Sequence, residues 1–114
     1  MSEISILKKR AEFLKAAKAE SAGVRGLHLQ ARQRDPQEPS TSRIRLGITC
    51  SKKVGNAVMR NSAKRRLREA ARMILPTHGK EGWDYVLIGR RGVTIDRPWD
   101  DLLSDLQEAL AKVH

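Results

Sequence analysis

Residues 57–74 carry basic side chains on one face and apolar side chains on the other, a pattern that limits the possible folds of this chain more than any other. On a helical wheel with roughly 100° per residue, the basic and apolar side chains fall on opposite sides. The basic set is Arg60, Lys64, Arg68 and Arg72, flanked by Asn61 and Arg65, and the apolar set is Met59, Ala63, Leu67, Ala70 and Ile74. The spacing predicts an amphipathic helix that packs on a sheet. We expect Asn56 to cap its start and Pro76 to end it.

The charge on this segment points to a polyanionic partner. Cations four residues apart repel one another by roughly a few tenths of a kcal/mol per pair. Folding alone gives no reason to accept that cost, whereas phosphates would offset it by releasing counterions. The chain has 23 Lys and Arg against 13 Asp and Glu, a net charge of +10, and residues 52–72 alone carry a net +7 while residues 92–114 carry a net −3. A solvated basic face is the alternative, but this polarity favours an oriented partner, most often a nucleic acid.

The remaining patterns predict an α+β fold with one domain over residues 1–114, since 114 residues with 39% hydrophobic content supply one modest core. Helices are expected at residues 7–20, at 57–74 and from Pro98 onward, and strands at 24–34, 43–50 and 83–89, with an exposed loop at 35–42. The inner stripe of the last helix is predicted to be Leu102, Leu103, Leu106, Leu110 and Val113.

Several classes of protein are disfavoured by what the sequence lacks. The longest apolar run, residues 85–88, is far shorter than the ~18 residues of a membrane span, and the first ten residues contain no secretory segment. Cys50 is the one cysteine, so we expect a reducing, cytoplasmic location. His28, His78 and His114 are scattered and form no metal motif. We therefore expect neither catalytic residues nor a metal site on the polypeptide.

Three other binding proteins remain as alternatives. A small ribosomal protein would share the charge and the α+β order. A DNA-binding regulator is disfavoured, because helix-turn-helix modules place a short helix and a tight turn before the recognition helix, and here a strand and residues 51–55 come first. A membrane-surface helix is disfavoured because the apolar face contains neither Trp nor Phe.

A resemblance to a known family narrows these alternatives. Residues 51–69, Ser-Lys-Lys-Val-Gly-Asn-Ala-Val-Met-Arg-Asn-Ser-Ala-Lys-Arg-Arg-Leu-Arg-Glu, resemble the signature stretch of the bacterial ribonuclease P protein component. Residues 7–10, followed by Phe13, are similar to that family's first helix, and residues 84–90 resemble its last strand. The resemblance implies a four-stranded mixed sheet with three helices in the order α-β-β-β-α-β-α. It also implies a left-handed β-α-β crossover, an exception to the usual hand.

The resemblance also implies a function. Members of this family are the accessory protein of a ribonucleoprotein endonuclease that removes the 5′ leader from precursor tRNA. The RNA subunit performs the hydrolysis with Mg²⁺, which is bound mainly by the RNA and the substrate. The implied partners are that catalytic RNA and the leader, with no membrane and no obligatory protein partner.

The implied contact residues fall into two sets. Those that match the family's RNA-contacting pattern, together with Arg72 from the basic row, are Lys52, Lys53, Arg60, Asn61, Lys64, Arg65, Arg68 and Arg72. The implied leader-binding residues are Phe13, Leu27, Leu29 and Gln30, with an ordinary core position as the alternative for Phe13.

Three positions depart from the family pattern. Ser62 stands where a third member of an Arg-Asn-Arg triplet is common, Ala17 replaces a second aromatic residue, and Gln30 replaces an aromatic residue on a strand. We therefore expect leader binding to depend more on charge and hydrogen bonds than on base stacking.

Overall fold

In the part of the chain that the computed structural model describes, residues 4–35 and 44–114, five strands form one mixed sheet in the order β1-β4-β5-β3-β2. The strands are β1 (Ile4–Ile6), β2 (Glu20–Gly23), β3 (Leu27–Gln33), β4 (Ile44–Thr49) and β5 (Trp83–Gly89). The helices are α1 (Arg10–Ala17), the short 3₁₀ helix η1 (Lys52–Val54), α2 (Ala57–His78), α3 (Val93–Asp96) and α4 (Trp99–Val113). Nearly all of the predicted loop at 35–42 lies outside the described residues.

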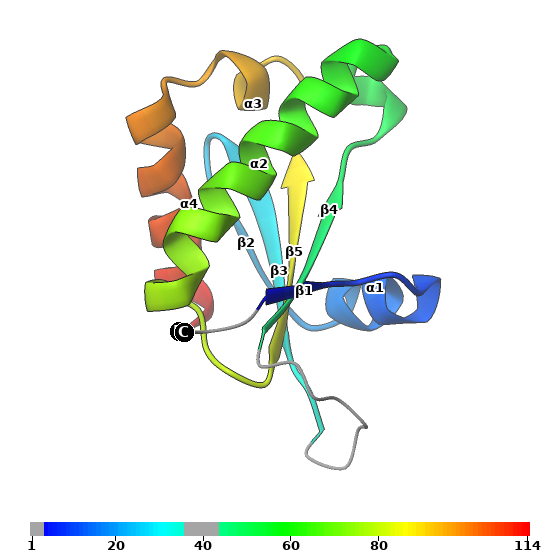
Figure 1. The fold of residues 1–114 in the computed structure, drawn as a ribbon, viewed down its shortest axis with the longest axis vertical. Coiled ribbons are helices and arrows are strands. Elements are labelled where there is room, and N and C mark those ends of the chain that lie inside the picture. Colours follow the sequence, from blue (N-terminus) through cyan, green and yellow to red (C-terminus); the bar gives the residue numbers. More distant parts are fainter. Residues whose placement is uncertain (1–3, 36–43) are drawn as a thin grey trace.

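The connection from β4 through α2 to β5 is the unusual feature of the topology. The two strands are parallel neighbours, and Leu46 lies opposite Tyr85. In Figure 1, α2 lies in front of the sheet, both strands run upward, and β5 lies to the left of β4. The crossover is therefore left-handed, as the family resemblance implied.

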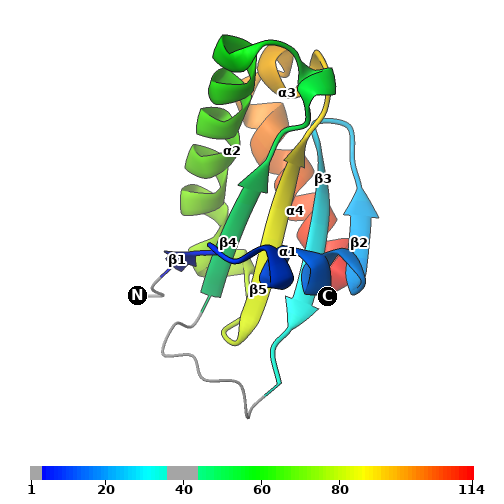
Figure 2. The same ribbon diagram turned by 90° about the vertical axis from the view of Figure 1, so that its right-hand side faces the viewer.

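The two faces of the sheet are covered unequally (Figures 1 and 2). Helices α2 and α4 pack on one face over the main core, which contains Leu29, Leu46 and Leu87 from the central strands. On the other face α1 lies across the sheet, and a small second cluster joins Leu7 and Ala16 to Val86. This second side, which we call the α1 face, is covered only in part, because α1 has eight residues.

The structure corrects the predicted elements near the N-terminus. The sheet has five described strands rather than four, because Ile4–Ile6 forms β1 and pairs in parallel with β4. The first helix is Arg10–Ala17 rather than 7–20, and residues 20–23, partly assigned to that helix, form β2. The strand predicted at 24–34 begins only at Leu27, because residues 24–26 turn the chain between the antiparallel strands β2 and β3.

Helix α2 continues past the proline that was predicted to end it. Pro76 lies inside the helix, which runs to His78. Proline deprives only the carbonyl four residues earlier of its helical donor. That residue, Arg72, is exposed, so water can hydrogen-bond its carbonyl oxygen. The helix closes with a hydrogen bond from the Gly79 N–H to the Leu75 carbonyl oxygen, 2.8 Å.

The apolar faces of the two long helices follow the predicted pattern with exceptions at their edges. In α2, Ala63, Leu67, Ala70 and Ile74 are buried as expected, but Met59 is 42% exposed. In α4, Leu102, Leu106 and Leu110 are buried, whereas Leu103 and Val113 are only partly buried. No helix in the described ranges has the length and apolar content that crossing a membrane requires.

Candidate nucleic-acid interface

The turn before α2 places basic residues at one end of the sheet. The Ser51 hydroxyl accepts a hydrogen bond from the Lys53 N–H, 3.3 Å, and this contact organises η1 with Lys52 and Lys53 exposed. Asn56 caps α2 as predicted, its Oδ1 accepting from the Met59 N–H, 3.0 Å. Gly55 between them has φ 145°, a value that side-chain-bearing residues rarely adopt. The backbone thus brings the lysine pair directly to the start of the basic helix.

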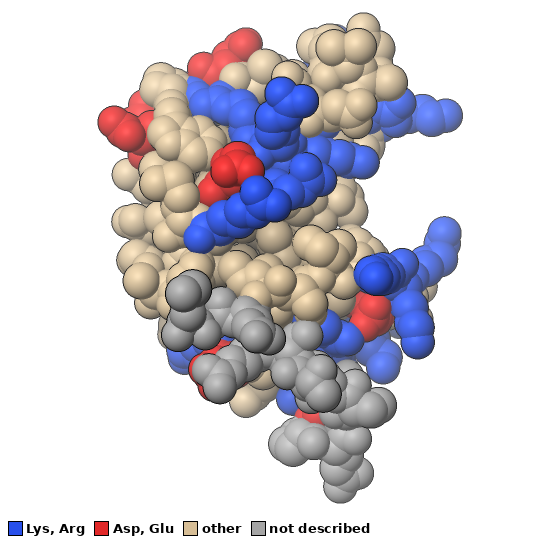
Figure 3. All heavy atoms as spheres, in the orientation of Figure 1, with Lys and Arg blue, Asp and Glu red and all other residues tan. Residues whose placement is uncertain are grey.

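The basic row winds around α2 instead of occupying one line. A four-residue step exceeds one helical turn, so each step rotates the row by about 40°. Arg60 and Lys64 are accordingly half-buried against the end of the sheet, whereas Arg68 and Arg72 are exposed. The exposed part, which we call the α2 surface, consists of Asn61, Arg65, Arg68 and Arg72. Figure 3 shows Lys and Arg side chains running along α2 in a diagonal band.

The half-buried start of the row lies beside Cys50. Burial raises the pKa of the Cys50 thiol, and a hydrogen bond to the Gly89 backbone and the charges of Lys64 and Arg60 oppose that rise only in part. The Arg60 Nε is buried and has no hydrogen-bond partner among the described residues. A buried donor without an acceptor is rare in folded proteins, so the Arg60 guanidinium is the least satisfied polar group that the described residues bury.

Partners within the chain divide the arginines of α2 into different roles. Arg72 pairs with Glu69 at 2.8 Å on the exposed side. Arg66 points the other way: its Nη1 donates to the Thr94 carbonyl oxygen, 2.9 Å, and it also donates to the carbonyl oxygens of Ile95 and Arg97. Its guanidinium lies over the Trp99 ring, 5.7 Å from the centroid. Arg66 therefore fastens α2 to the α3–α4 connection. The sequence counts it only as one more basic residue between positions 52 and 72, and does not show that its role is structural.

The α1 face contains only part of the predicted leader-binding set. Phe13 is partly buried and packs on the sheet at Gly47, where an ideal Cβ would lie 2.5 Å from the ring. Gln30 is half-buried and shares this face with Val86, its cross-strand partner. Because side chains alternate along a strand, His28 also lies on this side, opposite Ile88, as does Thr49 on β4. The same alternation from Gln30 could have predicted His28 from the sequence.

Leu27 and Leu29 do not belong to this face. Both have no exposed surface and lie in the main core on the side of α4. Side chains with no exposed surface cannot contact a leader, so the two leucines are removed from the candidate set. The period-two alternation of β3 explains the error, since residues 27 and 29 point opposite to residues 28 and 30.

A buried acid joins three arginines under α1. Asp84 on β5 has no exposed surface and accepts from Arg34 at 2.6 Å and from the Nε and Nη2 of Arg45 at 2.7 Å each. Arg32 lies 3.5 Å away. Arg45 also pairs with Glu12 of α1, whose other oxygen accepts from the Lys9 N–H at the start of that helix, 3.0 Å. This network fastens α1 to the sheet.

The acidic, histidine and cysteine side chains do not gather into a metal-binding cluster in the described part of the chain. Within residues 4–35 and 44–114, no group of three or more His, Cys, Asp or Glu side chains could hold a metal ion. Asp84, the most buried acid, is occupied by arginines. An Mg²⁺ ion at the described part of this protein would therefore need ligands from RNA or water in addition to any that the protein supplies.

The fold and the surface define a small, strongly basic α+β protein that presents one helix of a left-handed crossover to solvent. The family model described as Ribonuclease P matches residues 1–114, and the chain belongs to this family. It is 60% identical over 113 residues to the Ribonuclease P protein component of Ruegeria pomeroyi, with 99% of this chain and 89% of the relative covered. The corresponding protein of Caulobacter vibrioides is 49% identical over 104 residues, with 91% and 67% covered.

Solved structures agree with this assignment. The RNase P protein of Staphylococcus aureus superposes with a TM-score of 0.72 at 31% identity, over 95% of both chains. The RNase P protein from Thermotoga maritima has a TM-score of 0.73 at 24% identity, over 92% of this chain and 93% of the other, and supports the fold. Because the chain belongs to this family, we set aside the three alternatives of a small ribosomal protein, a DNA-binding regulator and a membrane-surface helix.

Proposed function

We propose that this chain is the protein subunit of ribonuclease P. It binds the catalytic RNA through η1, the start of the basic row and the α2 surface, and it holds the 5′ leader of precursor tRNA on the α1 face. The RNA subunit, with Mg²⁺ held by RNA and substrate, performs the hydrolysis. This role implies a cytoplasmic location, where precursor tRNA is made, and requires no further protein partner.

One observation carries the proposal. Arg65 and Arg68 are exposed on α2, and no acid among the described residues lies within ion-pair distance of either. Arginine favours bidentate contacts to phosphate, and Asn61 beside them can donate and accept at a base edge or a sugar. The winding of the row extends this surface from the outside of α2 to Arg60 and Lys64 at the end of the sheet, next to Lys52 and Lys53.

The α1 face supports the second half of the proposal. Polar His28, Gln30 and Thr49 alternate there with apolar Val86 and Ile88, a mixture that suits single-stranded RNA. A leader held on the protein is present in the substrate and absent from the mature tRNA. The protein can therefore tighten substrate binding without tightening product binding.

A cleavage assay tests the proposed function directly. Precursor tRNA is incubated at low Mg²⁺ with the matching catalytic RNA, with and without this protein. We expect the mature 5′ end to appear only with the protein, because its cations offset the repulsion between two RNA backbones that Mg²⁺ otherwise screens. Tight binding to the catalytic RNA without any rescue of cleavage would contradict the proposal, and cleavage by the protein alone would overturn the assignment of hydrolysis to RNA.

Replacing Phe13 is expected to affect leader binding only moderately. Its ring is partly buried on Gly47, and the family's other aromatic positions are Ala17 and Gln30 here. Each base stacked on an aromatic side chain contributes ~1–3 kcal/mol, and Phe13 is the one Phe, Tyr or Trp that the described residues place on this face. Phe13→Ala should lower the preference of the holoenzyme for precursor over mature tRNA by less than the loss of two α2 arginines does. Equal losses would show that stacking on Phe13 dominates.

A further inference from the structure

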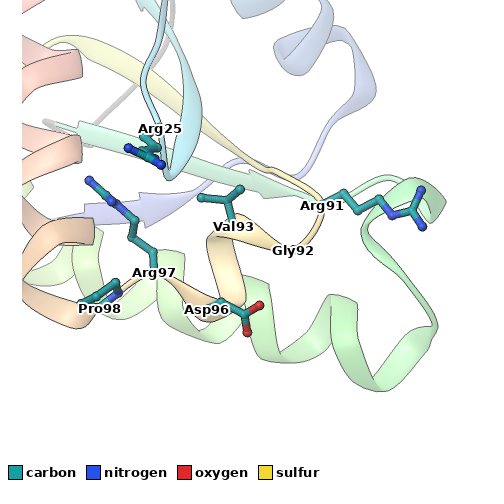
Figure 4. A pocket seen from close by; sticks show the side chains of 7 residues that line it. All are labelled: Arg25, Arg91, Gly92, Val93, Asp96, Arg97 and Pro98. Atoms are coloured by element: carbon teal, nitrogen blue, oxygen red, sulfur yellow. The ribbon is translucent and has the colours of Figure 1, made fainter.

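An open pocket lies outside both proposed RNA-contacting surfaces, at the end of the molecule where β3 begins and β5 ends. It is lined by Arg25 on the turn between β2 and β3, by residues 91–93, and by residues 96–98. Figure 4 shows the side chains of Arg25 and Arg97 reaching toward the same space from opposite walls, whereas Arg91 extends away. Two guanidinium groups from distant parts of the sequence therefore share one opening.

The backbone around this pocket is held firmly. The Thr94 hydroxyl, which is fully buried, donates to the Gly26 carbonyl oxygen at 2.6 Å and accepts from the Arg90 N–H at 2.7 Å. The Val24 N–H donates to the Leu27 carbonyl oxygen, 3.1 Å, and closes the turn. An ideal Cβ at Gly26 would lie only 2.6 Å from the carboxylate of Asp105. Arg25 is thus presented on a turn whose position is fixed before any ligand binds.

The charged side chains at the pocket have a net charge of one positive unit. Arg97 is oriented by Asp105, with Nε to Oδ2 at 2.8 Å and Nη2 to Oδ1 at 3.1 Å, and its Nη1 takes no part in that pair. Asp105 is buried, so it neutralises Arg97 from beneath the opening. Arg25 is exposed and forms no ion pair with any acid in the described ranges. The pocket is lined by three arginines, Arg25, Arg91 and Arg97, against one acid, Asp96, and with Asp105 beneath the opening this set carries one net positive charge, which one phosphodiester group balances.

Further arginines connect this pocket to the basic end of α2. Arg90 and Arg91 follow β5, whose parallel neighbour β4 leads directly into Lys52 and Lys53. The Arg90 side chain reaches toward β2, since an ideal Cβ at Gly23 would lie 2.9 Å from its Nη2. Basic side chains therefore follow one another across the end of the sheet, from η1 to the turn that bears Arg25. A strand of RNA that leaves the α2 end has a positively charged path to the pocket.

We propose that the pocket between Arg25 and Arg97 binds a backbone phosphate of the RNA that docks on α2. Arg25 donates from the turn and Arg97 donates through Nη1, while Asp105 keeps the Arg97 guanidinium in place. The pocket extends the footprint of the RNA around the end of the sheet to the side of α3 and α4. The inference rests on the proposed function only for the identity of the RNA.

The test compares the salt dependence of RNA binding between the natural chain and Arg25→Ala. Binding to the catalytic RNA is measured between ~50 and ~200 mM salt, and loss of one phosphate contact is expected to flatten the log–log slope by ~0.7–0.9. Lys112→Ala is the matched control, because Lys112 is exposed, pairs with Glu108 at 3.1 Å, and lies near the C-terminus at the other end of the molecule. Its slope should equal that of the natural chain. Arg97 is left intact, since its pair with Asp105 is part of the fold.

Other outcomes separate this proposal from its competitors. An unchanged slope in Arg25→Ala overturns the pocket assignment, and if the natural chain still rescues cleavage, the proposed function survives. Failure of the natural chain in the cleavage assay contradicts the function instead. Inorganic phosphate is titrated into the free protein while the backbone amide signals of residues 24–26 are followed. Saturable shifts there, combined with an unchanged RNA slope, would identify a site for free anions and overturn the RNA contact.

Discussion

Asp84→Ala is expected to destabilise the protein by about 3–5 kcal/mol, the typical cost of removing one partner from a buried ion pair. Asp84 is fully buried and accepts hydrogen bonds from Arg34 and Arg45, with Arg32 nearby. Without it, three guanidinium groups would face one another under α1 with no carboxylate at their centre. Urea unfolding followed by circular dichroism measures the loss. For a domain of this size it is a large share of the total stability.

The control for this measurement is Asp100→Asn. Asp100 is exposed in the first turn of α4, where its charge favours the helix dipole, so we expect a change below about 1 kcal/mol. If Asp84→Ala unfolded at the same urea concentration as Asp100→Asn, with an unchanged slope of the transition, the network would not stabilise the fold.

The double substitution Arg65→Ala with Arg68→Ala is expected to flatten the salt dependence of binding to the catalytic RNA by ~1.4–1.8 log–log units, two phosphate contacts at ~0.7–0.9 each. Both side chains are exposed on the α2 surface, so their removal leaves the core intact. Affinity at low salt should fall accordingly. Filter binding or fluorescence anisotropy over a salt series gives the slope, and thermal unfolding confirms that the variant is folded.

Arg66→Ala is the matched control on the same helix. It removes one guanidinium from α2 as well, but this group holds the carbonyl oxygens of Thr94, Ile95 and Arg97. We expect it to lower stability and to leave the slope of the folded protein unchanged. If Arg66→Ala flattened the log–log slope by half as much as the double substitution of Arg65 and Arg68, it would equal one surface arginine in effect. The RNA-binding face of α2 would then have been assigned wrongly.

The elements with long, regular patterns were predictable from the sequence, and the short ones were not. Helix α2 and strand β5 were predicted close to their observed positions because each buries one continuous face or run. Strand β1 has three residues and forms only because the edge of β4 is available, a long-range pairing that no local pattern reports. The division of residues 20–34 into β2 and β3 depends on the tight approach of Gly26 to α4, which is likewise a tertiary contact.

The sequence predicts the residues of the candidate site where their exposure follows from charge and helical spacing. It does not predict them where exposure depends on which side chains the tertiary structure buries. The exposed arginines of α2 follow from helical spacing. Leu27 and Leu29 were assigned to the wrong face because the sequence does not show which face of a half-buried strand the larger helical layer covers. Arg66 and Asp84 looked like ordinary charged residues, and only their partners, some thirty to fifty positions away along the chain, reveal structural roles.

The attachment of α1 has a consequence for motion. Among its eight residues only Ala16 is buried, and Phe13 is partly so, whereas α2 buries six side chains. Apart from these contacts, α1 is held by the pair between Glu12 and Arg45. Elements with few buried apolar contacts open locally at a fraction of the global free energy of unfolding. Helix α1 is therefore expected to open locally before the sheet and the layer of α2 and α4 do. If the α1 face binds the leader as we propose, that binding surface has one adjustable side, formed by α1, and one rigid side, formed by the sheet.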